Sequence, residues 1–144
     1  MESEAKLSIE LIWEDVDLEE LFITASNGEY CGCARVYFAQ RDIAALAETI
    51  QGFPKAVSQV EVFEGGQEDG PRAKLVFRCI DQLGHAAVRV SLVEFAYGNA
   101  PLPIMNDVNL EMRFEASALD RFCKELEGIG KRARKLAILR GLTA

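Results

Sequence analysis

One dipeptide constrains the fold of this chain more than any other feature. Asn27-Gly28 lies between two segments, 18–26 and 29–38, in which apolar and polar residues alternate. Asn-Gly favours a type I′ hairpin turn, because both central residues of that turn have positive φ. Strands joined by such a tight reversal pair antiparallel. The sequence therefore predicts an antiparallel hairpin with a two-residue loop.

The register of this predicted hairpin sorts its side chains into a core face and an open face. A two-residue loop places Ser26 opposite Glu29 and Glu20 opposite Arg35, and the second pair combines opposite charges. The expected core face carries Leu21, Ile23, Ala25, Tyr30, Ala34, Val36 and Phe38. The open face carries Glu20, Phe22, Thr24, Ser26, Glu29, Cys31, Cys33, Arg35 and Tyr37.

A second hairpin is predicted around "DQLG", residues 81–84, between the segments 72–80 and 85–96. A four-residue loop puts Ile80 opposite His85 and collects the apolar residues of both segments on one face. A three-residue loop would mix the apolar and polar sets, so the four-residue loop is favoured.

The remaining elements follow from periodicity and from helix start and stop signals. Strands are expected at 7–13, with Leu7, Ile9, Leu11 and Trp13 on one face, near 58–64, and at 108–115 after the connection "YGNAPLPIMN". Helices are expected at about 41–51, with the apolar stripe Ile43, Leu46, Ala47 and Ile50, and from an N-cap at Ser117 to Gly128 or Gly130.

These elements give the order βββαββββα. We expect one α+β domain over residues 1–144, in which a mostly antiparallel sheet of about seven strands carries two amphipathic helices on one face. Residues 131–144 form a basic tail that closes with a short strand or a helical turn. A chain of 144 residues can bury a core without disulfides or metals.

Composition excludes several classes of function. The formal net charge of −7 disfavours a general nucleic-acid binder or a binder of anionic membranes, because phosphate contacts need clustered Lys and Arg. The N-terminus shows no basic region followed by an apolar run, so no signal peptide is expected, and no apolar run is long enough to span a bilayer. We therefore expect a cytoplasmic protein with reduced cysteines and no cofactor.

Cys31 and Cys33 raise the question of a metal or redox site. Residues two apart on a strand point the same way with Cβ atoms about 6–7 Å apart, which is too far for an unstrained disulfide. Zinc sites use four ligands with wider cysteine spacing, and Cys79 and Cys123 are expected in the core as small apolar side chains. We predict no metal site. The alternative is a site in which both open-face thiols meet His85.

His85 is the only histidine. It follows Gly84 at a hairpin mouth, with Arg78 and Arg89 expected nearby. A histidine that acts as a base needs a carboxylate to orient it, and Asp81 is the only local candidate. A structural or exposed His85 is the favoured interpretation.

Two charged runs interrupt the pattern. The acidic run 14–20 lacks the glycine and spaced terminal glutamate of a calcium-binding loop, so it is interpreted as a solvated turn. "KRARK" at 131–135, with Arg140, is interpreted as a solvated tail. The alternative is that these basic side chains contact the acidic body of this or another chain, or an anionic ligand.

The sheet face opposite the helices is expected to be partly apolar, with Phe22, Tyr37, Val76, Ile80, Val93 and Phe95 on it. Exposed apolar area of that size marks an interface or a ligand groove. The alternative is that the sheet curls and covers part of itself.

Four stretches together carry a resemblance: "ASNGEYCGCARVYF", the helix ending "GFP", "LGHAAVRVSL" and "LEMRFEASALDRFCKELE". They resemble a group of small bacterial α+β proteins, a domain of unknown function, with the same element order over nearly the whole chain. Domains of this kind sometimes sit beside toxin–antitoxin or immunity genes, so the resemblance implies a protein partner by analogy. It supplies no catalytic residue.

The hypothesis is thus a non-catalytic domain that binds a protein partner, or a second copy of itself, through the open sheet face. The alternative is a small-molecule-binding protein or enzyme with a pocket near His85. The residues assigned to binding are Phe22, Tyr37, Arg78, Ile80, His85, Arg89 and Phe95. No residue is assigned to catalysis.

Overall fold

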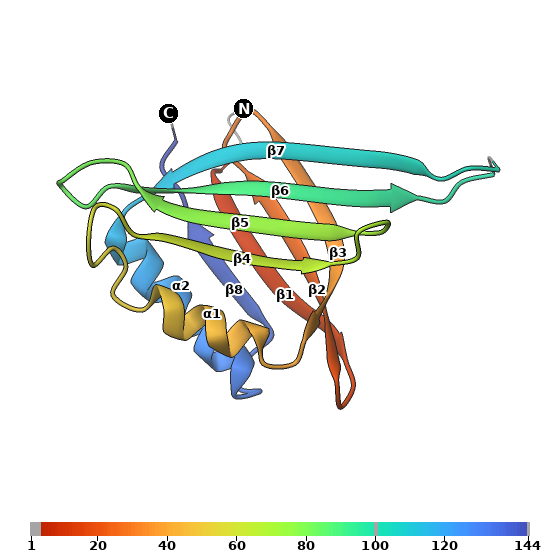
Figure 1. The fold of residues 1–144 in the computed structure, drawn as a ribbon, viewed down its shortest axis with the longest axis horizontal. Coiled ribbons are helices and arrows are strands. Elements are labelled where there is room, and N and C mark those ends of the chain that lie inside the picture. The colour runs from red at the N-terminus through yellow and green to blue at the C-terminus, as the bar shows by residue number, and fades with distance from the viewer. Residues whose placement is uncertain (1–3, 100, 144) are drawn as a thin grey trace.

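The computed structural model describes residues 4–99 and 101–143 and contains two antiparallel sheets and two helices (Figure 1). The elements are β1 (Lys6–Glu14), β2 (Leu18–Ser26), β3 (Cys31–Ala39), α1 (Asp42–Ile50), β4 (Val60–Gly66), β5 (Arg72–Cys79), β6 (Ala86–Ala96), β7 (Ile104–Phe114), α2 (Ala116–Gly130) and β8 (Leu136–Arg140). One sheet has the order β3-β2-β1-β8 and the other β4-β5-β6-β7. The α+β class and the antiparallel pairing are confirmed.

The prediction of one sheet of about seven strands is wrong. Between β3 and β4 the chain passes through α1 and the connection 51–59 instead of a tight turn, so β4 begins a new sheet. The basic tail forms β8, which pairs antiparallel with β1 and makes an eighth strand. The alternation of apolar and polar residues predicts neither the division into two sheets nor the pairing of β8 with β1, because both depend on contacts between segments far apart in the sequence.

The two sheets cross steeply and pack through their apolar faces (Figure 1). β3 passes across the inner face of the second sheet, where the rings of Phe38 and Phe63 stack with centroids 4.6 Å apart. A Cβ added to Gly65 would lie 2.3 Å from the Phe38 ring, so the absence of a side chain there permits the close crossing. This contact replaces the single helix-covered face that alternation predicts.

The helices pack against each other and against the β8 side of the core. Their predicted apolar stripes are confirmed as buried: Ile43, Leu46, Ala47 and Ile50 in α1, and Leu119, Phe122, Cys123, Leu126 and Ile129 in α2. α2 begins at Ala116 with Glu115 at its N-cap and no side-chain cap, so the predicted Ser117 cap is wrong. The Cys123 thiol donates to the Ala47 carbonyl at 3.1 Å, which joins the two helices.

The β2–β3 hairpin, predicted around Asn27-Gly28, has a four-residue loop, so its predicted register is wrong by two positions. Ser26 lies opposite Cys31, and Arg35 lies opposite Phe22 instead of Glu20. The side chain of Asn27 accepts hydrogen bonds from the backbone N–H groups of Glu29 and Tyr30 at 3.0 and 2.9 Å, which widens the turn.

A shift of two positions keeps every strand residue on its predicted face. Only Tyr30 changes its predicted environment: it lies in the turn and is exposed. The second hairpin has the predicted register, because the Ile80 N–H donates to the His85 carbonyl and Cys79 lies opposite Ala86.

A β-bulge in β1 corrects one more assignment. The register between β1 and β2 shifts between Leu11 and Trp13. After such an irregularity the side chains exchange faces, so Trp13 lies beside Glu20, outside the core, and is about half exposed. Its ring contacts the ring edge of Tyr37, with centroids 6.1 Å apart.

Candidate interaction surface

The β6–β7 hairpin extends past the rest of the protein and forms an arm (Figure 1). The arm consists of the end of β6 from Val93 and the start of β7 up to Val108. The two strands pair without a break out to Ala96 and Ile104. Pro101 and Pro103 follow in the connection, where the missing proline N–H does not interrupt a ladder.

The end of this arm is apolar and exposed. We call four exposed side chains at this end the apolar tip. They are, with their exposed fractions, Tyr97 (78%), Leu102 (76%), Ile104 (59%) and Met105 (55%). Between Arg89 and Arg113 the chain has no lysine or arginine, so the arm carries only negative charge, at Glu94 and Asp107. Because Ile104 and Met105 are consecutive strand residues, they face opposite sides of the hairpin, so the tip exposes apolar side chains on both of its faces. Exposed apolar surface that gathers in one region marks interaction sites on soluble proteins.

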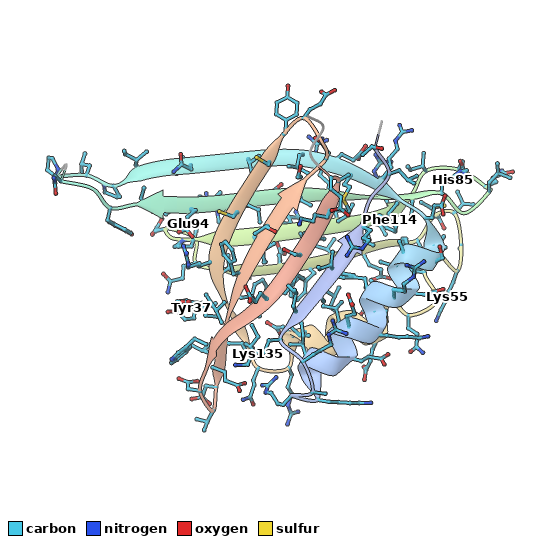
Figure 2. All side chains as sticks on the ribbon, turned by 180° about the vertical axis from the view of Figure 1, so that it is seen from behind. Tyr37, Lys55, His85, Glu94, Phe114 and Lys135 are labelled. Carbon is cyan, nitrogen blue, oxygen red and sulfur yellow. The ribbon has the colours of Figure 1, made fainter. Side chains whose placement is uncertain are left out.

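The base of the arm is fixed to the first sheet by a short set of contacts. The Glu94 carboxylate accepts a hydrogen bond from the Arg35 backbone N–H at 2.7 Å (Glu94 is labelled in Figure 2). Beside it, a Cβ added to Gly32 would lie 2.4 Å from Val108 Cγ1, so β3 and β7 approach closely. Val93 is 6% exposed. The arm is therefore anchored at its base and free beyond it.

The residues assigned to binding do not form one surface. The split into two sheets places Phe22 and Tyr37 on the outer face of the first sheet, while Arg78, Ile80, His85 and Arg89 lie on the second sheet and its β5–β6 turn. Figure 2 shows Tyr37 and His85 at opposite sides of the molecule. Phe95 lies on the arm opposite Met105 and is half-buried.

Phe22 and Tyr37 each have neighbours on the first sheet. The Arg35 guanidinium lies over the Phe22 ring, 5.0 Å from its centroid. The hydrogen bond and the negative charge of Glu20 raise the pKa of Tyr37. This face is a mixed aromatic and charged surface, separate from the arm tip.

Arg78 and Arg89, the two basic residues assigned to binding, are already paired. Arg78 forms an ion pair with Glu111, and Arg89 Nε donates to Asn109 Oδ1 at 2.8 Å. His85 Nδ1 lies 2.6 Å from Asp81 Oδ2, so Asp81 orients the ring as the sequence suggested.

The hydrogen bond from His85 lowers the pKa of Asp81. The neighbouring Cys79 thiol is engaged elsewhere, because it donates to the backbone carbonyl of Asp81 at 2.9 Å. The arrangement is an oriented histidine at a hairpin end.

The cysteines occupy three different environments: two are exposed, one is buried, and Cys79, expected in the core, is half-buried. Cys31 and Cys33 are exposed on the same side of β3, as predicted, and Gly32 between them faces Val108. Cys123 is buried, and that burial raises the pKa of its thiol. In the part of the chain that the structure describes, no three His, Cys, Asp or Glu side chains gather as metal ligands. The two exposed thiols and His85 lie on different sheets.

A concave pocket of about 410 Å³ lies on the second sheet near the β4–β5 turn. Its lining includes Glu64, Gln67, Arg72, Lys74 and Val93. It does not include His85, Arg78 or Arg89, the residues around which the alternative hypothesis placed a pocket. Acidic and basic side chains are mixed in its wall, which does not select one sign of ligand charge.

The acidic and basic runs contact each other, which is the alternative stated for the basic residues. Residues 14–18 are exposed as expected, and the interpretation as a solvated turn is wrong at Glu19. Glu19 is fully buried, and Arg132 Nη1 lies 3.2 Å from its Oε2. Arg132 Nε also lies 2.7 Å from Glu14 Oε2, and Glu14 is the cross-strand neighbour of Glu19. Two further tail arginines form ion pairs, Arg134 with Glu125 and Arg140 with Glu4.

Neither oxygen of Glu19 receives a well-aligned hydrogen bond from the described residues. Burial raises the pKa of Glu19; Arg132 opposes this shift, and the negative charge of Glu14 adds to it. This cluster joins the end of α2 to the β1–β2 hairpin, which is a structural role.

Sequence reasoning missed the arm tip and Glu19 for different reasons. The tip lies partly in a proline-containing connection, where no periodicity indicates exposure. Glu19 did carry a signal: it continues the alternation of Leu21 and Ile23 and so belongs to the core face.

In comparisons with known proteins, no family model, no curated protein and no solved structure matched the chain. Of the helices that the structure describes, neither α1 nor α2 is long and apolar enough to cross a membrane.

Proposed function

We propose that this chain is a non-catalytic domain that binds a protein partner through the apolar tip of the β6–β7 arm. The observation that carries the proposal is the exposure of Tyr97, Leu102, Ile104 and Met105 on a hairpin that extends beyond the rest of the protein. Placing four such side chains in water is unfavourable by an amount that grows with apolar area, and a partner surface removes that cost.

The arm replaces the open sheet face as the proposed contact surface. The predicted face is divided between two sheets, and its basic residues are engaged in Arg78–Glu111 and Arg89–Asn109 pairs. The arm, in contrast, carries Ile104 and Met105 on a two-stranded ladder anchored at Glu94, with Tyr97 and Leu102 in the connection beyond it. A preformed ladder limits the conformational entropy lost on binding.

We place the domain in the cytoplasm. Cys31 and Cys33 are exposed free thiols, and a reducing compartment keeps such thiols reduced. The resemblance to small bacterial domains supports a protein partner by analogy. A small molecule or enzymatic substrate at His85 is the weaker alternative, because the described pocket lies elsewhere on the sheet.

The chain offers a matched control for a test of this proposal. Leu102 in the β6–β7 connection and Leu83 in the β5–β6 turn are both highly exposed, at 76% and 84%. These two connections lie at opposite ends of the same sheet (Figure 1). Single surface substitutions of this kind change stability by about 0.5 kcal/mol or less. Loss of binding in only one of the two variants is therefore not a folding defect.

The experiment captures partners with the tagged wild type, with the arm variant Leu102→Ser and with Leu83→Ser in extracts of the cells that express the protein, and quantifies them by mass spectrometry. We expect one near-stoichiometric protein that the wild type and Leu83→Ser retain and the arm variant loses at least about tenfold. Identical recovery with all three baits would refute the proposal.

A further inference from the structure

The free edge of β7 adjoins the apolar tip, and part of this edge is already occupied. Asn27 Nδ2 donates to the Glu111 carbonyl at 3.2 Å, and the Leu142 N–H donates to the Arg113 carbonyl at 2.7 Å. Both carbonyls therefore point away from β6. Alternate residues of a strand present their backbone groups to the same edge, so Met105, Asp107 and Asn109 do so as well.

The outward backbone groups of Met105, Asp107 and Asn109 have no partner among the residues that the structure describes. The part of this stretch up to Asp107 lies on the arm, past the point where β3 approaches β7 at Val108, and no other element runs beside β7 there (Figure 1). The open edge is thus a short ladder of unpaired N–H and C=O groups. An extended peptide can add a strand to such an edge, with main-chain hydrogen bonds as the source of affinity.

The remaining sheet edges are less open to an incoming strand. On β3, the Arg35 N–H donates to Glu94 and the Ala39 N–H to Asp42 Oδ2 at 2.9 Å. On β8, the Ile138 N–H donates to Glu125 Oε1 at 2.9 Å. β4 has α1 beside it. The start of β7 is the edge that stands clear of the body.

The charge of this stretch argues against a second copy of the same chain. Consider two copies whose β7 edges pair antiparallel about a two-fold axis. The one register that uses all three outward-facing residues places Met105 opposite Asn109 and Asp107 opposite Asp107. Like charges directly opposite on paired strands are destabilising, and each copy carries a net charge of −7. With no lysine or arginine between residues 90 and 112, the arm offers no compensating cation.

We propose that residues 105–109 are a strand-addition site for an extended segment of another protein that carries a Lys or Arg opposite Asp107 and an apolar residue beside Met105. This inference rests on the proposed function and specifies how the arm is used. The backbone ladder supplies affinity, Asp107 selects a basic residue, and the apolar tip buries the neighbouring apolar side chain of the partner.

Two blocked seven-residue peptides test this mode of binding with the intact protein: one with lysine at its centre, valine two residues to either side and threonine elsewhere, and one with glutamate in place of that lysine. The central residue and the two valines then share a face, as Asp107 and Met105 do. We expect the lysine peptide to bind and to slow hydrogen exchange at the Met105, Asp107 and Asn109 amides. Asp107→Lys should weaken binding of the lysine peptide about two- to fivefold and strengthen binding of the glutamate peptide by a similar factor. Asp69→Lys, in the exposed β4–β5 turn, should change neither.

A backbone variant separates strand addition from simple charge attraction. Asp107→Pro removes an N–H that points away from β6, so the native ladder keeps its bonds. It should bind the lysine peptide about tenfold more weakly than Asp107→Asn, which has the same net charge.

Equal binding by these two variants, no binding of the lysine peptide at millimolar concentration, or a dimer of the protein that Asp107→Pro disrupts would each overturn the inference. If the arm variant loses its cellular partner while the peptide fails to bind, the proposed function stands and only the strand-addition mode fails.

Discussion

Glu94 on β6 accepts hydrogen bonds from two backbone N–H groups, that of Arg35 on β3 at 2.7 Å and that of its neighbour Phe95 at 3.0 Å. The first of these links the base of the arm to the edge strand of the other sheet. It also occupies an edge N–H that would otherwise be open to a foreign strand. Glu94 thus fixes the arm and protects β3 with one carboxylate.

Replacing Glu94 with alanine should loosen the base of the arm. We expect the free energy of unfolding to fall by about 0.5–1.5 kcal/mol, because both N–H groups lose their acceptor. Hydrogen exchange at the Arg35 amide should accelerate, and Glu94→Gln, which keeps one acceptor oxygen, should lie between the alanine variant and the wild type. Unchanged exchange at Arg35 in the alanine variant would contradict this assignment.

Gly32→Ala should separate β3 from β7. The added methyl group would meet Val108 Cγ1 at 2.4 Å, so one strand has to shift. We expect a loss of about 1–3 kcal/mol in thermal or denaturant unfolding, the usual cost of overpacking. Adding Val108→Ala to the Gly32→Ala variant should restore part of the lost stability, because it removes the side-chain atoms that the new methyl group meets. Gly98→Ala is the matched control, since nothing lies within 4 Å of the added Cβ there.

Glu19 should make the protein less stable as pH rises. Folding raises the pKa of this buried carboxyl above its usual value, so the folded chain binds more protons than the unfolded chain between the two values. The free energy of unfolding must then fall as pH increases through that interval. Glu19→Gln should lack this component, whereas Glu29→Gln, in the exposed turn, should keep it. Denaturant unfolding from pH 4 to pH 8 measures the difference.

Removing Arg132 should increase the cost of burying Glu19. Arg132→Ala leaves that carboxylate without its cation, and we expect a loss of about 1–3 kcal/mol at neutral pH. Most of this loss should disappear in Arg132→Ala/Glu19→Gln. A double-mutant cycle with no coupling between the two positions would show that the pair does not join α2 to the β1–β2 hairpin.

The Asp81–His85 contact predicts a local change of pKa. The hydrogen bond from His85 lowers the pKa of Asp81, so this carboxylate favours the folded state above its unfolded-state pKa, and that preference is lost as pH falls through the folded-state value. In His85→Ala the pKa of Asp81 should rise toward its ordinary value. A carboxyl carbon titration by NMR measures it directly, and an unmoved titration would exclude the contact in solution.

Local alternation predicted the face of most strand residues, even where the register was wrong; Trp13 and Val93 are exceptions. A shift of two positions in the β2–β3 hairpin leaves Leu21, Ile23 and Ala25 in the core, because strand side chains repeat every two residues. The bulge before Trp13 broke this rule because one extra residue exchanges faces, and the sequence carries no mark of it.

Local sequence patterns could not predict which strands far apart in the chain pair or pack together. The division into two sheets depends on the Phe38–Phe63 crossing and on the pairing of β1 with β8, which lies near the other end of the chain. The arm tip is defined by the absence of neighbours in the described fold. No spacing of residues encodes such an absence, so the "YGNAPLPIMN" connection gave no indication of a site.

The most direct test of the arm as the contact surface is site-specific photo-crosslinking in living cells. A photoreactive residue replaces Leu102 in one variant and Leu83 in another, since both positions are highly exposed. The account predicts a discrete crosslinked protein from position 102 and none from position 83. Equal products from both positions, or none from position 102, would contradict it.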